Sequence, residues 1–252
     1  MLLVVAVIVI LIGMLLPLMS KSKTATRLVI CTVNQRNLGQ GAIAYSVNSQ
    51  GKLFPYDNAA GLKYETFWMT LIDVYIGDMD QMRMCPETVL SQALQNSPQG
   101  VGWGTAKAAW GHPWSPGGFI GANYGSYGWN SWMHSGRTDI ANSATPNSAE
   151  QRKYWKNVRA CRTPMMTPFF SDMHWVDTWF QNNPNGAFDV PPDNLLHRNT
   201  ASGRVCINRH DRSIGHGFVD GSGGTTSLEG LWGLTWNTES QPMNPPWAIP
   251  PQ

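Results

Sequence analysis

The chain opens with a long stretch of apolar residues. Residues 1–19, MLLVVAVIVILIGMLLPLM, contain no charged side chain. At a rise of about 1.5 Å per residue, a helix of this length extends roughly 28 Å, close to the thickness of a bilayer core. A secretory signal peptide would carry a basic segment before this run and a small-residue cleavage site after it, and neither pattern is present. The stretch therefore predicts an apolar helix that forms a membrane segment or the core of an assembly.

The helical period continues beyond the apolar run. A stripe of residues repeats at alternating steps of three and four, with Gln35 as its polar member. The stripe consists of Leu28, Cys31, Gln35, Leu38, Ala42 and Tyr45. We expect one helix within residues 1–50 that ends near Val47, before Asn-Ser-Gln-Gly. Its second half packs on a head domain, its first half projects from that head, and Pro17 weakens the helix locally.

Shorter elements are predicted over residues 51–252. A second helix is expected over 64–76, with Phe67, Leu71 and Val74 on one face, and residues 98–136 are expected to be mostly irregular with short strands. Residues 85–97 form either a short helix or an irregular segment. Strands are predicted at 163–173, 203–210, 215–222 and 228–237. With 203–210 and 215–222 paired as an antiparallel hairpin, the fold class is α+β: one long N-terminal helix and a head with an antiparallel β-sheet and long irregular loops.

Composition narrows the class of protein. Charged residues make up 13% of the chain, the net charge is +2, and there are 12 tryptophans. A low charge with many aromatic residues argues against disorder, and the small net charge without a basic run argues against a nucleic-acid partner. The cysteines are dispersed without a C-x-x-C pair, which suits two disulfides in an exported protein or, alternatively, separate buried thiols. These cysteines are Cys31, Cys85, Cys161 and Cys206.

Tryptophan is concentrated between residues 98 and 136. Such side chains fill a core or a contact between subunits, or they form an exposed surface that binds a ligand such as a glycan. We favour core or subunit contacts and keep the ligand surface as the alternative. The residues are Trp103, Trp110, Trp114, Trp129 and Trp132.

The segment RHDRSIGHGFVDGS, residues 209–222, carries the candidate chemistry. His210, His216 and Asp220 share parity along the chain, so a regular hairpin would direct them to one side as metal ligands. A hydrolase would need a nucleophile placed against a base, and the serines here lack the G-x-S-x-G elbow. We favour a structural hairpin over a metal site, and a metal site over hydrolysis, and therefore expect no enzyme.

Several motifs together resemble one family. The chain is similar to type IV pilin-like proteins, and more narrowly to type II secretion pseudopilin-like proteins with a C-terminal processing-associated signature, H-x9-D-G. His210, Asp220 and Gly221 meet the signature's spacing. The N-terminal pattern of that group is matched at Leu2 to Val5, Leu15 to Pro17, Cys31, Asn34, Arg36, Leu38, Gly39, Tyr45, Gly51, Phe54 and Pro55.

The resemblance implies a structural subunit. Its apolar helix would build the core of a homopolymeric helical filament, extracellular or periplasmic, after insertion in the bacterial inner membrane and with the secretion or pilus assembly machinery as partner. It implies no cofactor, with calcium as the alternative because some pseudopilins bind it in a C-terminal loop. The same alignment places Met1 where pilins carry a glutamate, so the prepilin cleavage site would lie upstream. The filament-core residues would be Leu2, Leu3, Val4, Val5, Val7, Ile8, Ile10, Leu11, Leu15, Leu16 and Pro17.

A membrane-tethered extracytoplasmic binding protein is the alternative function. In that case residues 1–19 are an anchor, and the aromatic-rich part of the head binds glycan. The filament hypothesis predicts polymers without detergent, whereas the tether predicts monomers that need it.

Overall fold

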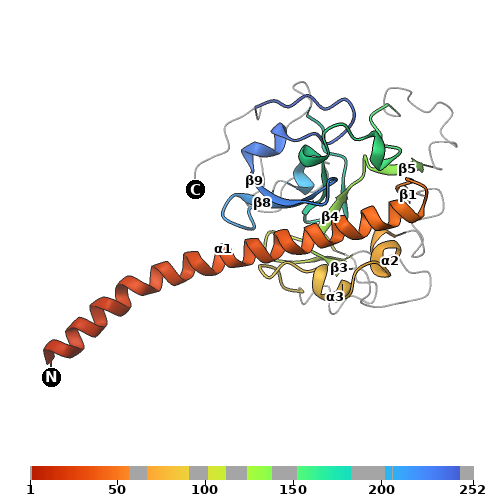
Figure 1. Ribbon diagram of the computed structural model, residues 1–252. Helices are drawn as coiled ribbons and strands as arrows, with labels where there is room; N and C mark the ends of the chain where they lie inside the picture. Colours follow the sequence, from red (N-terminus) through yellow and green to blue (C-terminus); the bar gives the residue numbers. More distant parts are fainter. Residues whose placement is uncertain are drawn as a thin grey trace.

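A long helix carries a mixed α+β head in the computed structural model of the chain (Figure 1). The helices are α1 (Leu2–Asn48), α2 (Trp68–Asp73) and α3 (Met79–Met82). Short 3-10 turns occur later in the chain and include η4 (Pro164–Met166), η5 (Ser202–Arg204) and η6 (Glu229–Gly233). The structure describes residues 2–56, 67–90, 102–111, 124–137, 152–182, 202–205 and 207–244. Within these residues the predicted α+β class is confirmed.

The head is organised around a five-stranded sheet in the order β7-β4-β6-β8-β9. All of its neighbouring pairs are antiparallel except β4 with β7. Two small sheets, β1-β5 and β2-β3, complete the described strands. The strands are β1 (Phe54–Tyr56), β2 (Trp110–Gly111), β3 (Tyr124–Gly125), β4 (Tyr127–Asn130), β5 (His134–Arg137), β6 (Pro168–Asp172), β7 (Asp177–Thr178), β8 (Ser213–Phe218) and β9 (Gly223–Ser227).

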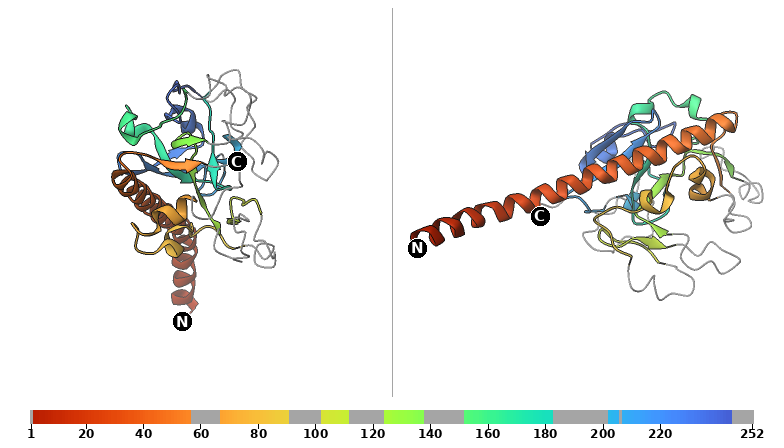
Figure 2. Two further views of the ribbon diagram at one scale, coloured as in Figure 1. Left: turned by 90° about the vertical axis from the view of Figure 1, so that its right-hand side faces the viewer. Right: turned by 60° about the horizontal axis from the view of Figure 1, so that its bottom comes forward.

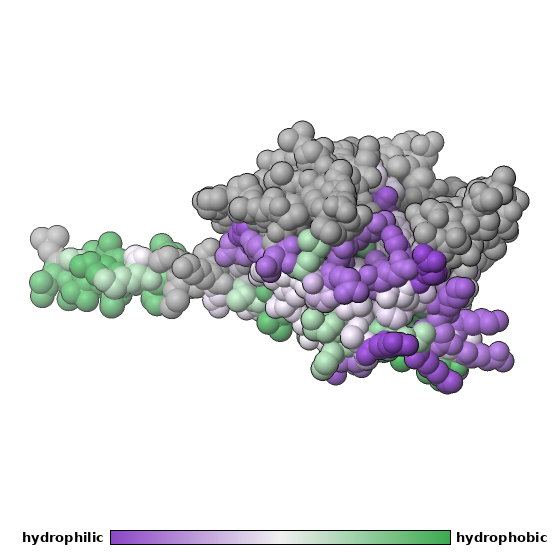
Figure 3. All heavy atoms as spheres, turned by 90° about the horizontal axis from the view of Figure 1, so that it is seen from above, coloured by the Kyte–Doolittle hydropathy of each residue, from purple (hydrophilic) through white to green (hydrophobic). Residues whose placement is uncertain are grey.

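The helix α1 has two environments, as its pattern predicts. Its C-terminal half lies along the head, where Cys31, Gln35, Leu38 and Ala42 of the predicted stripe are buried. Its N-terminal half extends away from the head (Figures 1 and 2), and Figure 3 shows apolar residues around this projection. Each apolar side chain of the projecting half that the structure describes as exposed is at least 49% exposed. They are Leu3, Val4, Val5, Val7, Ile8, Val9, Ile10, Leu11, Ile12, Met14, Leu15, Leu16 and Met19.

Among the described residues, no helix combines the length and the sustained apolarity needed to cross a membrane.

The end of α1 follows from its sequence. The predicted Asn-Ser-Gln-Gly terminus is confirmed, because Gln50 and Gly51 adopt positive φ angles of 58° and 87°. The Gly51 N–H donates to the Ser46 carbonyl at 2.7 Å, the bond that closes a helix with a left-handed residue. The chain then turns back and begins β1 beside the end of the helix (Figure 1).

Glycines on β8 let the sheet approach α1 closely. A Cβ atom added at Gly217 would lie 2.1 Å from the Gln35 carbonyl oxygen, and one added at Gly215 would lie 2.9 Å from the Gln35 Nε2. Because side chains alternate along a strand, Gly215 and Gly217 face the helix while His216 faces the other side. The helix therefore rests directly on the strand backbone.

The other side of the sheet is covered by aromatic residues. His216 lies beside the Trp236 ring, which stacks on Phe180 at a centroid distance of 4.6 Å. Trp110, Trp129 and Trp132 are also buried, which confirms the core interpretation for these three tryptophans and removes them from a ligand surface. Trp103 is half-buried and stacks on Trp175 at 4.0 Å, and Trp114 lies outside the described residues.

Among the predictions for the last strands, the one at 215–222 is confirmed in β8, whereas those at 203–210 and 228–237 were wrong. Residues 203–210 contain η5 and a turn instead of a strand, and β8 pairs with β9 and β6. Residues 228–237 form η6 and a loop, because Leu231, Trp232 and Trp236 are buried from an irregular backbone. The strand that follows β8 at one edge of the sheet is β9, whose Gly-Gly-Thr-Thr-Ser sequence has the composition of a turn.

Earlier segments agree only in part with the predictions. The helix expected over 64–76 is described as α2, and residues 64–66 lie outside the described residues. Of its predicted face, Phe67 is buried and Leu71 packs partly on the core, but Val74 is 81% exposed. The buried residues within α2 are Trp68, Met69 and Ile72. Residues 85–90 are irregular, the second of the two alternatives for 85–97, and the remainder of that range lies outside the described residues. The strand predicted at 163–173 is divided between η4 and β6.

Candidate functional site

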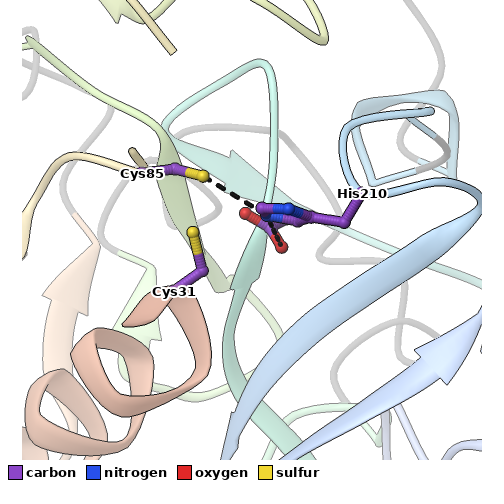
Figure 4. A group of neighbouring side chains, drawn as sticks. Cys31, Cys85 and His210 are labelled. Atoms are coloured by element: carbon purple, nitrogen blue, oxygen red, sulfur yellow. Dashed lines mark hydrogen bonds and ion pairs between the residues drawn. The ribbon is translucent and has the colours of Figure 1, made fainter. Parts of the chain in front are cut away.

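Four side chains from distant parts of the chain meet under α1. The Sγ atoms of Cys31 and Cys85, a carboxylate oxygen of Asp172 and a ring nitrogen of His210 lie within 4.8 Å of one another, and all four residues are buried. Figure 4 shows the labelled Cys31, Cys85 and His210 side chains pointing toward a common centre. It is the group of potential metal ligands that the described part of the chain brings together.

The two cysteines approach from the helix and from the head. Cys31 belongs to the buried stripe of α1, and Cys85 follows α3 in an irregular segment. The Cys85 Sγ lies 3.3 Å from the His210 Nε2 and also accepts the Glu87 N–H at 3.4 Å. Both cysteines are free thiols in the structure. The cluster therefore links α1 to a loop that packs on it.

The environment separates the two thiols chemically. Burial raises the pKa of the Cys31 thiol well above its ordinary value. Burial also acts to raise the pKa of Cys85, but hydrogen bonds with Cys31 and His210 outweigh it and lower this pKa to about 6. Cys85 is thus the thiol that gives up its proton first.

Asp172 ends strand β6 and is held by two donors. Its Oδ2 accepts the Gly215 N–H at 2.9 Å, and its Oδ1 accepts from the Arg209 Nη1 at 3.1 Å. The Arg209 guanidinium is buried and donates further to the carbonyl oxygens of Thr105, Ala106, Ser126 and Met173. The carboxylate is therefore oriented and charge-compensated without help from the cysteines.

His210 is placed by a tight turn. Asp211 and Arg212 have positive φ angles of 52° and 62°, and His210 forms an antiparallel bridge with Ser213. Two central residues with positive φ are the mark of a two-residue hairpin turn with right-handed twist. The turn directs the His210 Nε2 to 3.6 Å from the Asp172 Oδ2, while its Nδ1 has no hydrogen-bond partner among the described residues.

The metal set His210, His216 and Asp220 is not the one that the structure assembles. His216 Nδ1 and Nε2 lie 2.7 Å from the hydroxyl oxygens of Ser171 and Thr226, so both ring nitrogens are in use on the other side of the sheet. Asp220 accepts from the backbone and hydroxyl of Ser222 in the β8–β9 turn. Sequence parity failed as a guide because a turn separates His210 from β8.

The H-x9-D-G residues hold the helix at two points. His210 meets Cys31, and Gly221, with a φ of 82°, turns its carbonyl toward α1. That carbonyl accepts from Arg36 Nε and from Gln40 Nε2, each at 3.4 Å. Between these two points, β8 packs on the same helix through its glycines. The residues of this motif thus contact α1 and hold it against the head.

Cys161, the remaining cysteine among the described residues, does not join the cluster. Cys161 is a free thiol that lies 3.2 Å from the Thr167 hydroxyl, and burial raises the pKa of Cys161. Cys206 lies outside the described residues. The prediction of two disulfides stays a prediction, and the pair that the fold brings together is Cys31 with Cys85.

Sequence reasoning missed Asp172 and Arg209. Asp172 ends the apolar run Thr-Pro-Phe-Phe-Ser-Asp, where a lone buried carboxylate requires a partner, and Arg209 directly precedes the signature histidine. These two sequence positions could have indicated that Asp172 and Arg209 belong to the site.

Comparisons with protein-family models, with curated proteins and with solved structures gave no match. The functional argument therefore depends on the physical features of the chain.

Proposed function

We propose that this chain is a structural, pilin-like subunit that polymerises through its N-terminal helix into a helical filament. The observation that carries the proposal is the projecting half of α1, where apolar side chains from Leu3 to Met19 are exposed around the helix. A helix that is apolar on all sides requires a surrounding apolar environment. Neighbouring copies of the same helix supply one.

The energetic driving force is large. Burying one Val, Leu or Ile side chain contributes roughly 1.5–3 kcal/mol, so the projecting half supplies far more than a stable contact needs even after the entropy of association is subtracted. Exposed apolar residues continue along the outer side of the head-bound half at Val29, Ile30 and Val33. Helices packed in a bundle would bury this extension as well.

The asymmetric shape of the subunit favours an open polymer. A helix that inserts among other helices, with a head at one end, makes head-to-tail contacts instead of a contact between identical patches. Such contacts produce filaments when the rotation between subunits does not close a ring. The docking of β8 and Gly221 on α1 supports this role, because each head must stay attached to its helix while the filament carries load.

The proposal locates assembled subunits in an extracellular or cell-surface filament, with a secretion or pilus assembly machinery as partner, and assigns the chain no catalytic role.

Electron microscopy of the full chain tests the proposal. The chain is purified in detergent, the detergent is removed, and the product is imaged. We expect regular filaments with a dense central rod of helices and peripheral heads. Dispersed particles that need detergent would overturn the filament function and favour the membrane-tethered binding protein. Closed oligomers of fixed size would overturn the filament function as well.

A further inference from the structure

We propose that Cys31, Cys85, Asp172 and His210 form a structural binding site for one tetrahedral divalent cation of the zinc class. The four ligand atoms lie within 4.8 Å of one another and come from α1, the loop after α3, the end of β6 and the turn before β8 (Figure 4). This inference is independent of filament formation, because it concerns the interior of a single subunit.

The donor set selects the metal. Two sulfur atoms, one imidazole nitrogen and one carboxylate oxygen are ligands of zinc, which binds four such groups in tetrahedral geometry at structural sites. Calcium prefers six to eight oxygen ligands, and this cluster offers a single carboxylate. The site thus differs in both residues and metal from a calcium loop at the C-terminal hairpin.

The surrounding residues orient the ligands as a metal site requires. Asp172 is fixed by the Gly215 N–H and by Arg209, so its carboxylate is already directed before an ion arrives. The His210 Nε2 points to the centre, 3.3 Å from the Cys85 sulfur and 3.6 Å from the Asp172 oxygen. Ligand groups held by neighbouring hydrogen bonds bind metal more tightly than mobile ones.

One buried polar group at this interface, the Gln35 amide, supports a polar centre. The Gln35 amide, one helical turn after Cys31, is buried, and neither its oxygen nor its nitrogen has a hydrogen-bond partner among the described residues. A Cβ added at Gly215 would contact both the Gln35 Nε2 and the Asp172 Oδ2, at 2.9 Å and 3.2 Å, so the amide borders the Asp172 side of the cluster. The packing of α1 on the head is therefore not a purely apolar contact.

Charge balance is satisfied with and without the ion. In the metal-free protein the Asp172 carboxylate is compensated by Arg209. Two cysteine thiolates balance the charge of a bound divalent cation, and any proton still held by either sulfur passes to the solvent as its metal–sulfur bond forms. The exchange requires no oxidant or reductant.

A metal ion at this site would fasten the helix α1 to the head. Four protein ligands leave no open position for a substrate or water, which is the arrangement of structural sites. The ion would connect the long helix with three separate segments of the head, and His210 would be the link to the H-x9-D-G motif.

Cobalt titration of the reduced full chain in detergent tests the site. Co²⁺ replaces zinc and reports thiolate ligands through sulfur-to-cobalt charge-transfer absorption and tetrahedral coordination through its ligand-field bands. We expect saturation at one cobalt per chain and displacement of the cobalt by Zn²⁺. Cys85→Ser should weaken cobalt binding by about tenfold to a hundredfold. The double variant Cys31→Ser with Cys85→Ser should lack the charge-transfer band.

Cys161→Ser is the matched control, because it removes a thiol outside the cluster and should leave the cobalt spectrum unchanged. The wild-type spectrum and metal stoichiometry decide the question even if a ligand variant does not fold. A folded, reduced wild-type chain without charge-transfer absorption would overturn the proposal. So would a Cys31–Cys85 disulfide in the freshly isolated chain, identified by mass spectrometry of the linked peptides.

Discussion

At the scale of single residues, His216 shows how one buried side chain makes stability depend on pH. Its ring nitrogens each lie 2.7 Å from a hydroxyl oxygen, of Ser171 and of Thr226, and no acidic partner is among them. Burial lowers the pKa of His216 to about 3, and burial likewise lowers the pKa of His174 to about 4. Both imidazoles therefore stay neutral in the folded chain at mildly acidic pH.

We predict that acid weakens the fold before it protonates His216 in the native state. Between pH 6.5 and about 3 the unfolded chain binds a proton at this residue that the folded chain does not. The free energy of unfolding therefore keeps the whole contribution of neutral His216 above pH 6.5 and decreases as the pH falls below it. One such histidine changes the free energy of unfolding by at most about 1.4 kcal/mol per pH unit. Urea unfolding of the full chain in detergent at several pH values measures the slope.

His216→Gln is the informative variant, since glutamine keeps hydrogen-bonding groups but does not titrate. The stability difference between pH 6.5 and pH 4 should shrink by roughly 2–3 kcal/mol relative to the wild type. An unchanged difference would mean that other groups, His174 among them, cause the acid sensitivity.

Single residues of the candidate site were only half predictable from the sequence. His210 and Cys31 stand out by their motif and their helical stripe, but the partners that give them a chemical role are far away in the chain. Cys85 and His210 are 125 positions apart, and their contact at 3.3 Å depends on how the segment after α3 packs against the turn before β8. A local sequence pattern does not show which distant residues come into contact. The two-residue turn at Asp211 and Arg212 also breaks the strand alternation that would have placed His210 on the same side as His216.

At the scale of elements, the contact between α1 and β8 determines how the head packs on the long helix. The helix contacts β8 more than any other strand, and the glycines of Gly-His-Gly-Phe make that approach sterically possible. A Cβ at Gly217 would collide with the backbone of α1, whereas a Cβ at Gly215 would meet the ends of the Gln35 and Asp172 side chains.

We predict that Gly217→Ala is strongly destabilising. The added Cβ would lie 2.1 Å from the Gln35 carbonyl oxygen and 2.6 Å from its carbon, and both atoms belong to a helix backbone that cannot yield locally. Overpacking of a rigid contact costs typically 1–3 kcal/mol, and we expect the upper end of that range or more. Thermal unfolding in detergent is the measurement. Gly77→Ala is the control, since nothing lies within 4 Å of its added Cβ, and equal effects of the two substitutions would contradict this account of the packing.

Elements with a strong period were predictable, and elements defined by packing were not. The stripe on α1 and its terminus near Val47 follow directly from helical spacing, which is why this part of the fold agrees with the sequence. β9 has alternate side chains exposed and consists of Gly, Thr and Ser, so its strand conformation is imposed by pairing with β8. Trp232 and Trp236 are buried although they lie in η6 and the loop after it. Their apolar sequence is the pattern expected of a buried strand, and it therefore led to a wrong prediction.

At the scale of the whole molecule, one exposed apolar helix remains to be explained by assembly. We predict that Val9→Asp abolishes filament formation without affecting the head. Val9 is 62% exposed on the projecting half of α1, so a carboxylate there leaves the folded subunit intact but would be buried without a partner in a helical core. An unpaired buried charge costs several kcal/mol per subunit contact, and the cost recurs along the polymer.

Val74→Asp is the matched control for that experiment. Val74 is a valine with 81% exposure at the end of α2, on the head and away from the projecting half of α1, so the same substitution there should leave both stability and polymerisation unchanged. Both variants are compared with the wild type by sedimentation and electron microscopy after detergent removal. Filaments from Val9→Asp would show that the projecting helix is not the polymer core, whereas loss of filaments only in Val74→Asp would place the subunit contact on the heads. The pair of valines thus separates assembly through the helix from assembly through the surface of the head.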